Sequence, residues 1–218
     1  MSLSQDPKNK PLFQQNLYYV GPNPSTPHCQ QSAVPQIHPS AYIGPFACVM
    51  GNVTICENVF LAPHVTIRAD EGTPFLIGAN TNLQDGAIVH GLAGKTVTRN
   101  GQAYSIYIGE HVSLGHGCIV HGPCALDNHS FVGFGSLVLN AEIGEGSIVS
   151  HHAAVINGVH VPAGRIVAPG TLVDTQEKAD ALPAVSKADI AFTDDVQSVN
   201  NEFPAAYTKA FGKMNGSV

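Results

Sequence analysis

Aliphatic residues recur at every sixth position along most of this chain. They form four runs, separated by two insertions and by one slip of a single residue. The repeating positions are Ile37, Ile43, Val49, Ile55, Leu61, Ile67; Ile77, Leu83, Val89; Ile108, Leu114, Val120, Leu126, Val132, Val138; and Ile143, Val149, Val155, Val161, Val167, Val173. Neither an amphipathic helix, with a period of 3.6, nor a half-buried strand, with a period of 2, gives this spacing. The repeat therefore predicts one short strand and one turn in each hexad.

Three such hexads, 18 residues, close one triangular coil of a parallel β-helix. The aliphatic residue points into the prism, and the small residue four positions later, such as Ala41 or Ala47, fits the corner. Stacked coils pair strand to strand at ~4.8 Å, which satisfies the backbone along the whole prism. We therefore predict an all-β solenoid of hexapeptide repeats, a fold without a helical or sandwich core.

The repeat also divides the chain into three regions. Residues 1–35 form an extended N-terminal arm, residues 36–174 form the β-helix, and residues 175–218 form a C-terminal helical segment and tail. Extra residues at 70–75 and 92–105 leave the solenoid as loops, and loops on such a scaffold are where function concentrates. In the last region, a short helix capped by Asp174 or Thr175 precedes a longer one, which starts near Lys187 or Thr193 and runs towards Lys209.

Composition excludes several classes of partner. Charged residues are only 12% of the chain, about half the ~25% of an average soluble domain. The net charge is −6 with ten Lys and Arg and no basic run, so neither nucleic acid nor an anionic membrane is an expected partner. No stretch approaches the ~18 apolar residues of a membrane span. Eleven His, in contrast, suggest metal or acid–base chemistry.

Cysteine usage and the N-terminus bear on the compartment. The five Cys form no CxxC pair, which favours reduced thiols. The first ten residues contain no apolar segment of a secretion signal, so we expect a cytoplasmic protein, or a periplasmic one if a leader had been removed.

Three histidines form the most informative constellation. His90 and His121 each follow a repeating Val by one residue, and they are 31 positions apart. Subtracting the 13 extra residues of the second insertion leaves 18, one full coil, so they stack on one face ~4.8 Å apart and can converge on one metal ion. His116 lies across a corner and would meet the stacked pair of a neighbouring chain in a threefold trimer. Three His with an open fourth position are the ligand set of a catalytic zinc, although exposed His on a polar face is the alternative.

Polar residues cluster beside these histidines. The first insertion opens with Arg68, Asp70 and Glu71, and the coil of His90 carries Asn82, Gln84 and Asp85. Charges need partners when an interface buries them. This Arg–carboxylate cluster is consistent with an inter-subunit salt bridge and with a catalytic role, and the same residues can serve both.

The segments RADEGTPF (68–75), NTNLQDGAIVHGL (80–92) and SLGHGCIVHGP (113–123) resemble the motifs of the γ-class carbonic anhydrases. The resemblance covers about residues 35–205. It implies a left-handed β-helix, a homotrimer, and a zinc ion (with iron or cobalt also accepted) held between subunits. The residues that match the family's site are, for the metal, His90 and His121 of one chain and His116 of the next; beside the metal, Gln84; in the salt bridges, Arg68, Asp70 and Asp85; for proton handling, Glu71; at the rim of the active site, Asn82; and near the substrate, Asn200.

The chain departs from the family pattern in two places. Some members have a proton-shuttle glutamate three residues after the first ligand His and a tyrosine two residues before the helix asparagine, where this chain has Ala93 and Ser198. Carboxysome scaffold proteins share two of the motifs but continue into Rubisco-like repeats and use a C-terminal cysteine pair. Because this chain stops at 218 without a Cys after Cys124, we expect a free-standing enzyme.

The resemblance implies a carbonic anhydrase (carbonate dehydratase, a lyase) that interconverts CO2 and bicarbonate. In this mechanism a metal-bound hydroxide attacks CO2, Gln84 orients the hydroxide, Asn200 positions the gas and Glu71 relays the proton. Two alternatives stay open: a hexapeptide acyltransferase, which shares the prism but needs only one catalytic His, and a catalytically silent scaffold subunit.

Overall fold

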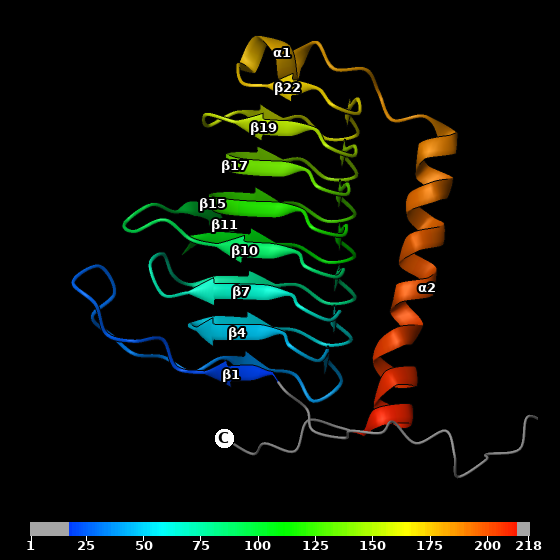
Figure 1. The fold of residues 1–218 in the computed structure, drawn as a ribbon. Helices are drawn as coiled ribbons and strands as arrows, with labels where there is room; N and C mark the ends of the chain where they lie inside the picture. The colour runs from blue at the N-terminus through cyan, green and yellow to red at the C-terminus, as the bar shows by residue number, and fades with distance from the viewer. Residues whose placement is uncertain (1–17, 213–218) are drawn as a thin grey trace, which may run out of the picture.

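The chain folds into a triangular prism of short parallel strands with one long helix along its side (Figure 1). The structure is a computed structural model and describes residues 18–212; the rest of the N-terminal arm and the last six residues of the tail lie outside this range. The fold is the predicted left-handed β-helix of hexapeptide repeats. Within the described residues, no helix has both the length and the apolarity needed to cross a membrane.

The prism has three faces. The first consists of β1 (Tyr19–Gly21), β4 (Cys48–Gly51), β7 (Thr66–Ala69), β10 (Ile88–His90), β15 (Ile119–Leu126), β17 (Leu137–Ile143), β19 (Ala154–Ile156) and β22 (Leu172–Val173). The second consists of β3 (Tyr42–Ile43), β6 (Phe60–Leu61), β9 (Asn82–Leu83), β14 (Ser113–Leu114), β16 (Phe131–Val132), β18 (Ile148–Val149) and β21 (Ile166–Val167). The third consists of β2 (Gln36–Ile37), β5 (Val53–Ile55), β8 (Phe75–Ile77), β13 (Ile106–Ile108) and β20 (His160–Val161), together with the C-terminal halves of β15 and β17, which continue onto it from the first face.

The repeating aliphatic residues fill the interior. From Ile43 to Val173 every one of them is at most 3% exposed, and the small residues at the corners, such as Ala47 and Val65, are buried with them. Ladder pairs join residues one coil apart, as in Val49 with Ile67. The core is therefore one column of stacked side chains, and each coil presents its outward residues at fixed heights.

The corners explain much of the histidine content. Many corner residues have a positive φ, which Gly adopts freely and which Asn and His tolerate better than most residues. Four of the eleven His are at such positions: His64, His111, His129 and His152, with φ between 55° and 62°. Backbone geometry is a sufficient reason for His at these four positions. They therefore do not count as evidence for metal or acid–base chemistry.

The second insertion is more ordered than a loop. Its strands β11 (Val97–Arg99) and β12 (Gln102–Tyr104) form an antiparallel hairpin around Asn100 and Gly101, which both have a positive φ. Arg99 anchors the hairpin to the third face through Asp127 and Glu142.

Two helices follow the last coil. The helix α1 (Gln176–Asp180) is capped by Thr175, and α2 (Lys187–Phe211) begins with a capping box formed by Ser186 and Asp189. Figure 1 shows α2 running back along the prism, where it contacts β3, β6, β9 and β14 of the second face. In the N-terminal region, β1 pairs with β4 and extends the first face, which the repeat did not predict.

Candidate metal and CO2 site

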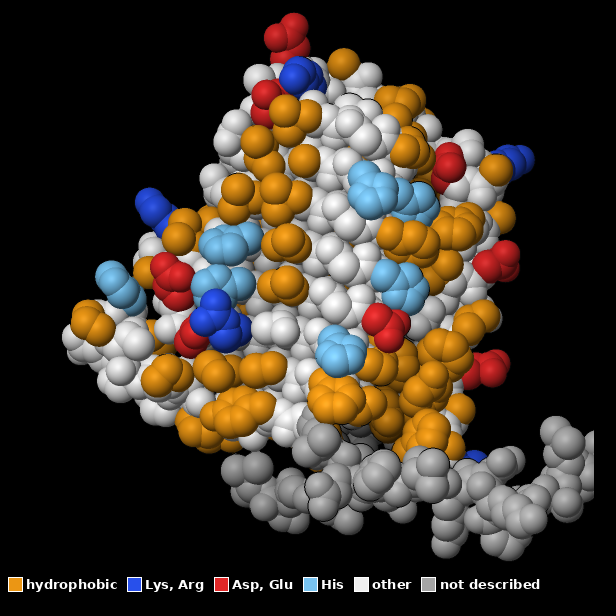
Figure 2. Space-filling model, in the orientation of Figure 1, with side chains coloured by type: hydrophobic (Ala, Val, Ile, Leu, Met, Phe, Trp, Pro, Cys, Tyr) orange, Lys and Arg blue, Asp and Glu red, His pale blue; other side chains and the backbone are white. Residues whose placement is uncertain are grey.

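The structure separates the ten predicted site residues into two clusters. The first cluster, on the first face, contains Arg68, Asp70, Glu71, His90 and His121. The second cluster, at the corner between the second and first faces and against α2, contains Asn82, Gln84, Asp85, His116 and Asn200. Figure 2 shows His side chains in separate groups on one side of the molecule, with hydrophobic side chains beside each group. Within one described chain, His116 does not join the stacked pair, and no group of three or more His, Cys, Asp or Glu is placed to hold a metal.

In the first cluster, adjacent rungs bring the histidine pair together. The ladder pairs Arg68 with His90 and His90 with His121, as the hexad count predicts. Nδ1 of His90 lies 3.2 Å from Nε2 of His121, and the rings meet nearly edge to face. Asp70 bridges this pair to Arg68: its Oδ1 is 3.1 Å from His90 Nε2, and its Oδ2 is 2.6 Å from Arg68 Nη1. Glu71 is less buried, with Oε2 3.8 Å from the same Nε2.

Each of the three histidines has one ring nitrogen beside an oxygen that can only accept a hydrogen bond. The pairs are His90 Nε2 with Asp70 Oδ1 (3.1 Å), His116 Nδ1 with Asp85 Oδ2 (3.1 Å), and His121 Nδ1 with the carbonyl of Gly122 (3.3 Å). In a neutral imidazole the N–H then points to this oxygen, and the opposite nitrogen carries the lone pair. Metal-binding histidines are oriented in the same way by carboxylates and carbonyls behind them.

This orientation makes the stacked pair suited to a cation. His90 Nδ1 and His121 Nε2 both present lone pairs to each other at 3.2 Å, and two acceptors at that distance repel unless a positive charge lies between them. Ligand nitrogens ~2.0–2.1 Å from a tetrahedral zinc are ~3.3 Å from each other. The donor set therefore fits zinc, since two candidate ligand nitrogens are already at the separation that zinc would require.

The second cluster is organised by buried amides. Gln84 donates from Nε2 to Asn82 Oδ1 at 3.3 Å, and Asn82 donates to Ser113 Oγ and to Gln197 Oε1 at 2.7 and 3.2 Å. The Nδ2 of Asn200 donates to the carbonyl of Val196. These bonds use the amide nitrogens of Gln84 and Asn200, so Gln84 Oε1 and Asn200 Oδ1 can accept from a water molecule or a substrate.

Sequence reasoning missed Gln197, which fastens α2 to Asn82. Gln197 is three positions before Asn200 on the predicted helix, so the two amides share a face of α2. This spacing is the sequence feature from which a role for Gln197 could have been predicted.

A hollow of about 510 Å³ lies beside the second cluster, between α2 and the corner. Its lining is mostly apolar and aromatic, with polar groups from the site: Phe60, Phe134, Phe192, Val199, Phe203, Tyr207, Gln84, Asp85, His116 and Asn200. Such a lining suits a small apolar molecule held beside a few polar groups.

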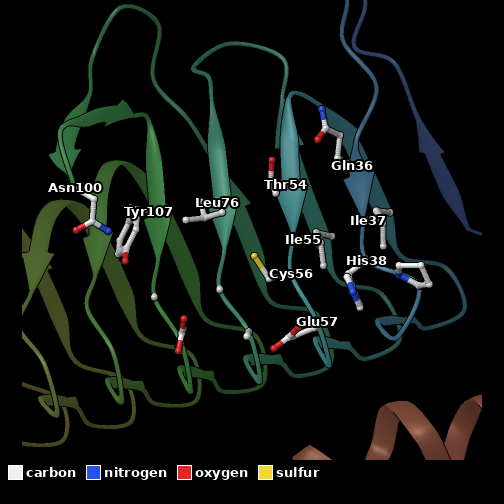
Figure 3. Close-up of a pocket in the computed structure, with 15 residues that line it drawn as sticks. Gln36, Ile37, His38, Thr54, Ile55, Cys56, Glu57, Leu76, Asn100 and Tyr107 are labelled. Carbon is white, nitrogen blue, oxygen red and sulfur yellow. The ribbon is translucent and has the colours of Figure 1, made fainter.

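A second hollow, of about 660 Å³, lies on the third face (Figure 3). It is open and crosses the neighbouring strands β2, β5, β8 and β13 from Gln36 towards Asn100, and Cys56 and Glu57 are among the residues that line it. None of the ten predicted site residues lines it, so it is separate from the candidate site.

The thiol of Cys124 packs against the backbone behind the histidine pair. Cys124 is fully buried, its Sγ is 3.1 Å from the carbonyl of His121, and burial raises its pKa to about 12. It is therefore a neutral donor to the backbone behind the site.

Comparison with known proteins is consistent with this architecture. The family model described as "Bacterial transferase hexapeptide (six repeats)" matches residues 35–69, which makes the chain a hexapeptide-repeat protein. The product of the BC4754 gene of Bacillus cereus, assigned as an acetyltransferase, superposes with a TM-score of 0.70 at 23% identity over 89% of this chain and 99% of its own, a similarity that concerns the fold alone.

Two proteins with higher sequence identity to this chain indicate its family more specifically. The carbonic anhydrase of Methanosarcina thermophila is 39% identical over 174 residues, which are 75% of this chain and 70% of that enzyme. The carboxysome assembly protein CcmM of a Nostoc species is 44% identical over 185 residues, which are 84% of this chain but only 33% of CcmM. The chain belongs to the γ-class carbonic anhydrase family.

Proposed function

We propose that this protein is a carbonic anhydrase that hydrates CO2 reversibly at a zinc ion bound between two chains of a homotrimer. The observation that carries the proposal is the histidine pair: His90 Nδ1 and His121 Nε2 face each other at 3.2 Å, while their other nitrogens are bonded to oxygens. His116 of the neighbouring chain would be the third ligand, since Asp85 holds its Nδ1 and leaves Nε2 free. Zinc bound there supplies the Lewis acidity that makes water a nucleophile near neutral pH.

The surfaces around the two clusters support an assembly of chains. In the first face, Ile88 and Ile119 are stacked one rung apart beside the histidine pair and are 40% and 38% exposed. Beside the second cluster, Phe134, Phe192 and Val199 are 37%, 45% and 54% exposed. An interface that joins the two clusters would bury both apolar surfaces and complete the ligand set.

The chain's own residues would share the remaining tasks. Gln84 offers Oε1 to orient the attacking water, and the aromatic hollow beside Asn200 holds CO2 next to it. Proton removal falls to Glu71, because this carboxylate is 39% exposed and lies 3.8 Å from His90 Nε2, so it reaches both the site and bulk buffer. Asp70 is bonded on both oxygens and therefore holds His90 in position instead.

The similarity to CcmM supports a second candidate, a subunit whose role is assembly without catalysis. The chain spans about a third of that relative, and the identity of 44% exceeds that with the enzyme from Methanosarcina. In that case the prism and its interfaces would be retained, and the histidine pair would only stabilise the trimer.

One experiment decides between the candidates. Protein purified without oxygen is analysed for metal, and the same sample is assayed for CO2 hydration by stopped flow. The enzyme proposal expects about one zinc or iron per chain and activity that disappears with a chelator and returns with zinc. A trimer that binds metal but does not accelerate hydration would support the assembly role and overturn the enzymatic one.

A further inference from the structure

Three segments that carry site residues bend around one buried side chain, that of Ser105. This residue lies between the hairpin and β13 and is fully buried. Its backbone N–H donates to the carbonyl of Pro74 at 2.9 Å, its carbonyl accepts from Cys124 N at 3.1 Å, and its hydroxyl accepts from Leu92 N at 3.4 Å. Ser105 thus joins three segments that are distant in sequence, through three different groups.

Each of these segments follows a site residue. Pro74 is three residues after Glu71, Leu92 is two residues after His90, and Cys124 is three residues after His121, where the pairing of β15 with β17 shifts register. Fixing these three points fixes the directions in which the preceding side chains leave the prism.

A glycine immediately follows each of the three site residues, and each packs against Ser105. A Cβ on Gly72 or on Gly91 would lie 2.2 or 2.7 Å from Ser105 Oγ, and a Cβ on Gly122 would lie 2.6 Å from its carbonyl oxygen. None of the three has a positive φ. These glycines are therefore required by space alone, because the three bends close on the serine and on one another: a Cβ on Gly72 would also meet the backbone of Leu92, and one on Gly91 the backbone of Gly72.

We infer that Ser105 is a positioning residue for the zinc site, which sets the separation and orientation of His90 and His121 through the glycine that follows each of them. The inference rests on the proposed metal site. Ser105 touches neither the imidazoles nor the reacting groups, so its effect is transmitted by the backbone. Removing the hydroxyl leaves Leu92 N without its acceptor and opens a space between the three bends, which lets the two rings move apart.

The test compares Ser105→Ala with Ser147→Ala. Ser147 is also fully buried, and its hydroxyl makes two hydrogen bonds, to the carbonyl of Pro162 and from Arg165 N, on coils away from the site. Zinc affinity is measured by competition with a chromophoric chelator, and melting temperature is measured on the same samples. Ser105→Ala is expected to bind zinc ~10-fold more weakly, as with other groups that support ligands indirectly, whereas Ser147→Ala loses stability only.

A second pair of variants tests the same contact by changing Gly91, the glycine that packs against Ser105. Gly91→Ala should weaken zinc binding more than Ser105→Ala does, because the new methyl group would lie 2.7 Å from both the hydroxyl and the carbonyl oxygen of Gly72. The double variant Gly91→Ala/Ser105→Ala relieves the first contact and keeps the second, so it should recover part of the lost affinity. Zinc affinity in Gly91→Ala equal to that of the parent protein would overturn the inference, even if Ser105→Ala itself did not fold.

A metal-free readout separates this inference from the proposed function. Long-range 1H–15N spectra of the apo protein report the ring nitrogens of His90 and His121 directly. Ser105→Ala should shift both sets of signals and Ser147→Ala neither. If the parent protein bound no zinc, the proposed site would fail while these spectra still decided the positioning role; unshifted signals in Ser105→Ala would overturn that role.

Discussion

Arg99 and Asp127 are joined by two parallel hydrogen bonds, 2.7 Å from Nε to Oδ1 and 3.2 Å from Nη2 to Oδ2. The hydrogen bond to Asp127 is also the main reason why the pKa of Arg99 is raised. Because Asp127 directly follows β15 on the third face, this bidentate pair holds the hairpin there and away from the histidine pair on the first face. Residues 92–105 contain no Asp or Glu, so this segment contributes no carboxylate to the site.

Proton transfer should consequently depend on buffer. With Ala93 in place of an acidic residue, Glu71 and small buffers are the only routes that we assign, so kcat should rise with buffer concentration while kcat/KM stays nearly flat. Glu71→Ala should lower kcat at low buffer and be partly rescued by imidazole, and Ala93→Glu should raise it. A kcat independent of buffer in the parent would show that another group, such as His64 or His111, carries the proton.

Releasing the hairpin should change its dynamics more than the stability of the prism. Arg99→Ala is expected to accelerate amide hydrogen exchange in residues 92–105 and to change the melting temperature little, because partly exposed ion pairs contribute ~0–1 kcal/mol. Lys95→Ala, in the same segment, is the control and should leave exchange unchanged. Slow exchange retained in Arg99→Ala would show that strand pairing alone holds the hairpin.

The shared site can be tested by mixing inactive chains. His116→Ala and His90→Ala proteins should each lose zinc and activity while the prism stays folded by circular dichroism. In mixed trimers, a His116→Ala chain still supplies His90 and His121, and a His90→Ala chain still supplies His116, so intact sites form at some interfaces. Regained activity on refolding the two together is the expected result; a site contained within one chain would give none. His129→Asn, which keeps a corner residue tolerant of positive φ, is the control.

Gln197 should affect turnover without affecting metal binding. Gln197→Met removes the acceptor that Asn82 and Ser113 share, which leaves buried donors unpaired at a cost of ~1–3 kcal/mol and loosens the amide of Gln84. We expect a lower kcat and unchanged zinc content. Gln176→Met on α1 is a matched change outside the site. Unchanged kcat would mean that Gln84 needs no support from α2.

The buried thiols predict a loss of stability in alkali. Burial raises the pKa of Cys118 and Cys124 from 9.0 to about 12. Below pH 9 both thiols stay protonated, whether folded or unfolded; between pH 9 and about 12 only the unfolded chain loses these protons, so the free energy of unfolding falls, by ~1.4 kcal/mol for each pH unit per group. Urea unfolding from pH 7 to 11 measures this slope. Cys118→Val should make it shallower, and an identical slope would assign the loss to other groups.

Much of the fold and part of the site could be predicted from sequence, because a period of six fixes both the register of the strands and the face of the prism on which each residue lies. The stacking of His90 on His121 follows from counting alone. The hexad count predicts only an inserted loop at 92–105, although Asn100-Gly101 between alternating residues is a strong signal for the two-residue turn of the hairpin. The partners of Arg99 and the role of Ser105 depend on contacts between distant coils, and no local pattern encodes them.

The stacking of coils has a consequence for how such a protein can change. His90 and His121 are 31 positions apart in the chain but neighbours on adjacent rungs, and the residues beyond one coil leave and return at nearly the same point. Provided that Leu92 and Ser105 keep their contact, the insertion between them can grow, shrink or acquire new chemistry without altering the separation of the two imidazoles. The metal-binding geometry and the route by which protons leave can therefore change independently of each other. Evolution or an engineer could replace the hairpin of one homologue with the loop of another, and so change the turnover rate while the histidines keep their positions.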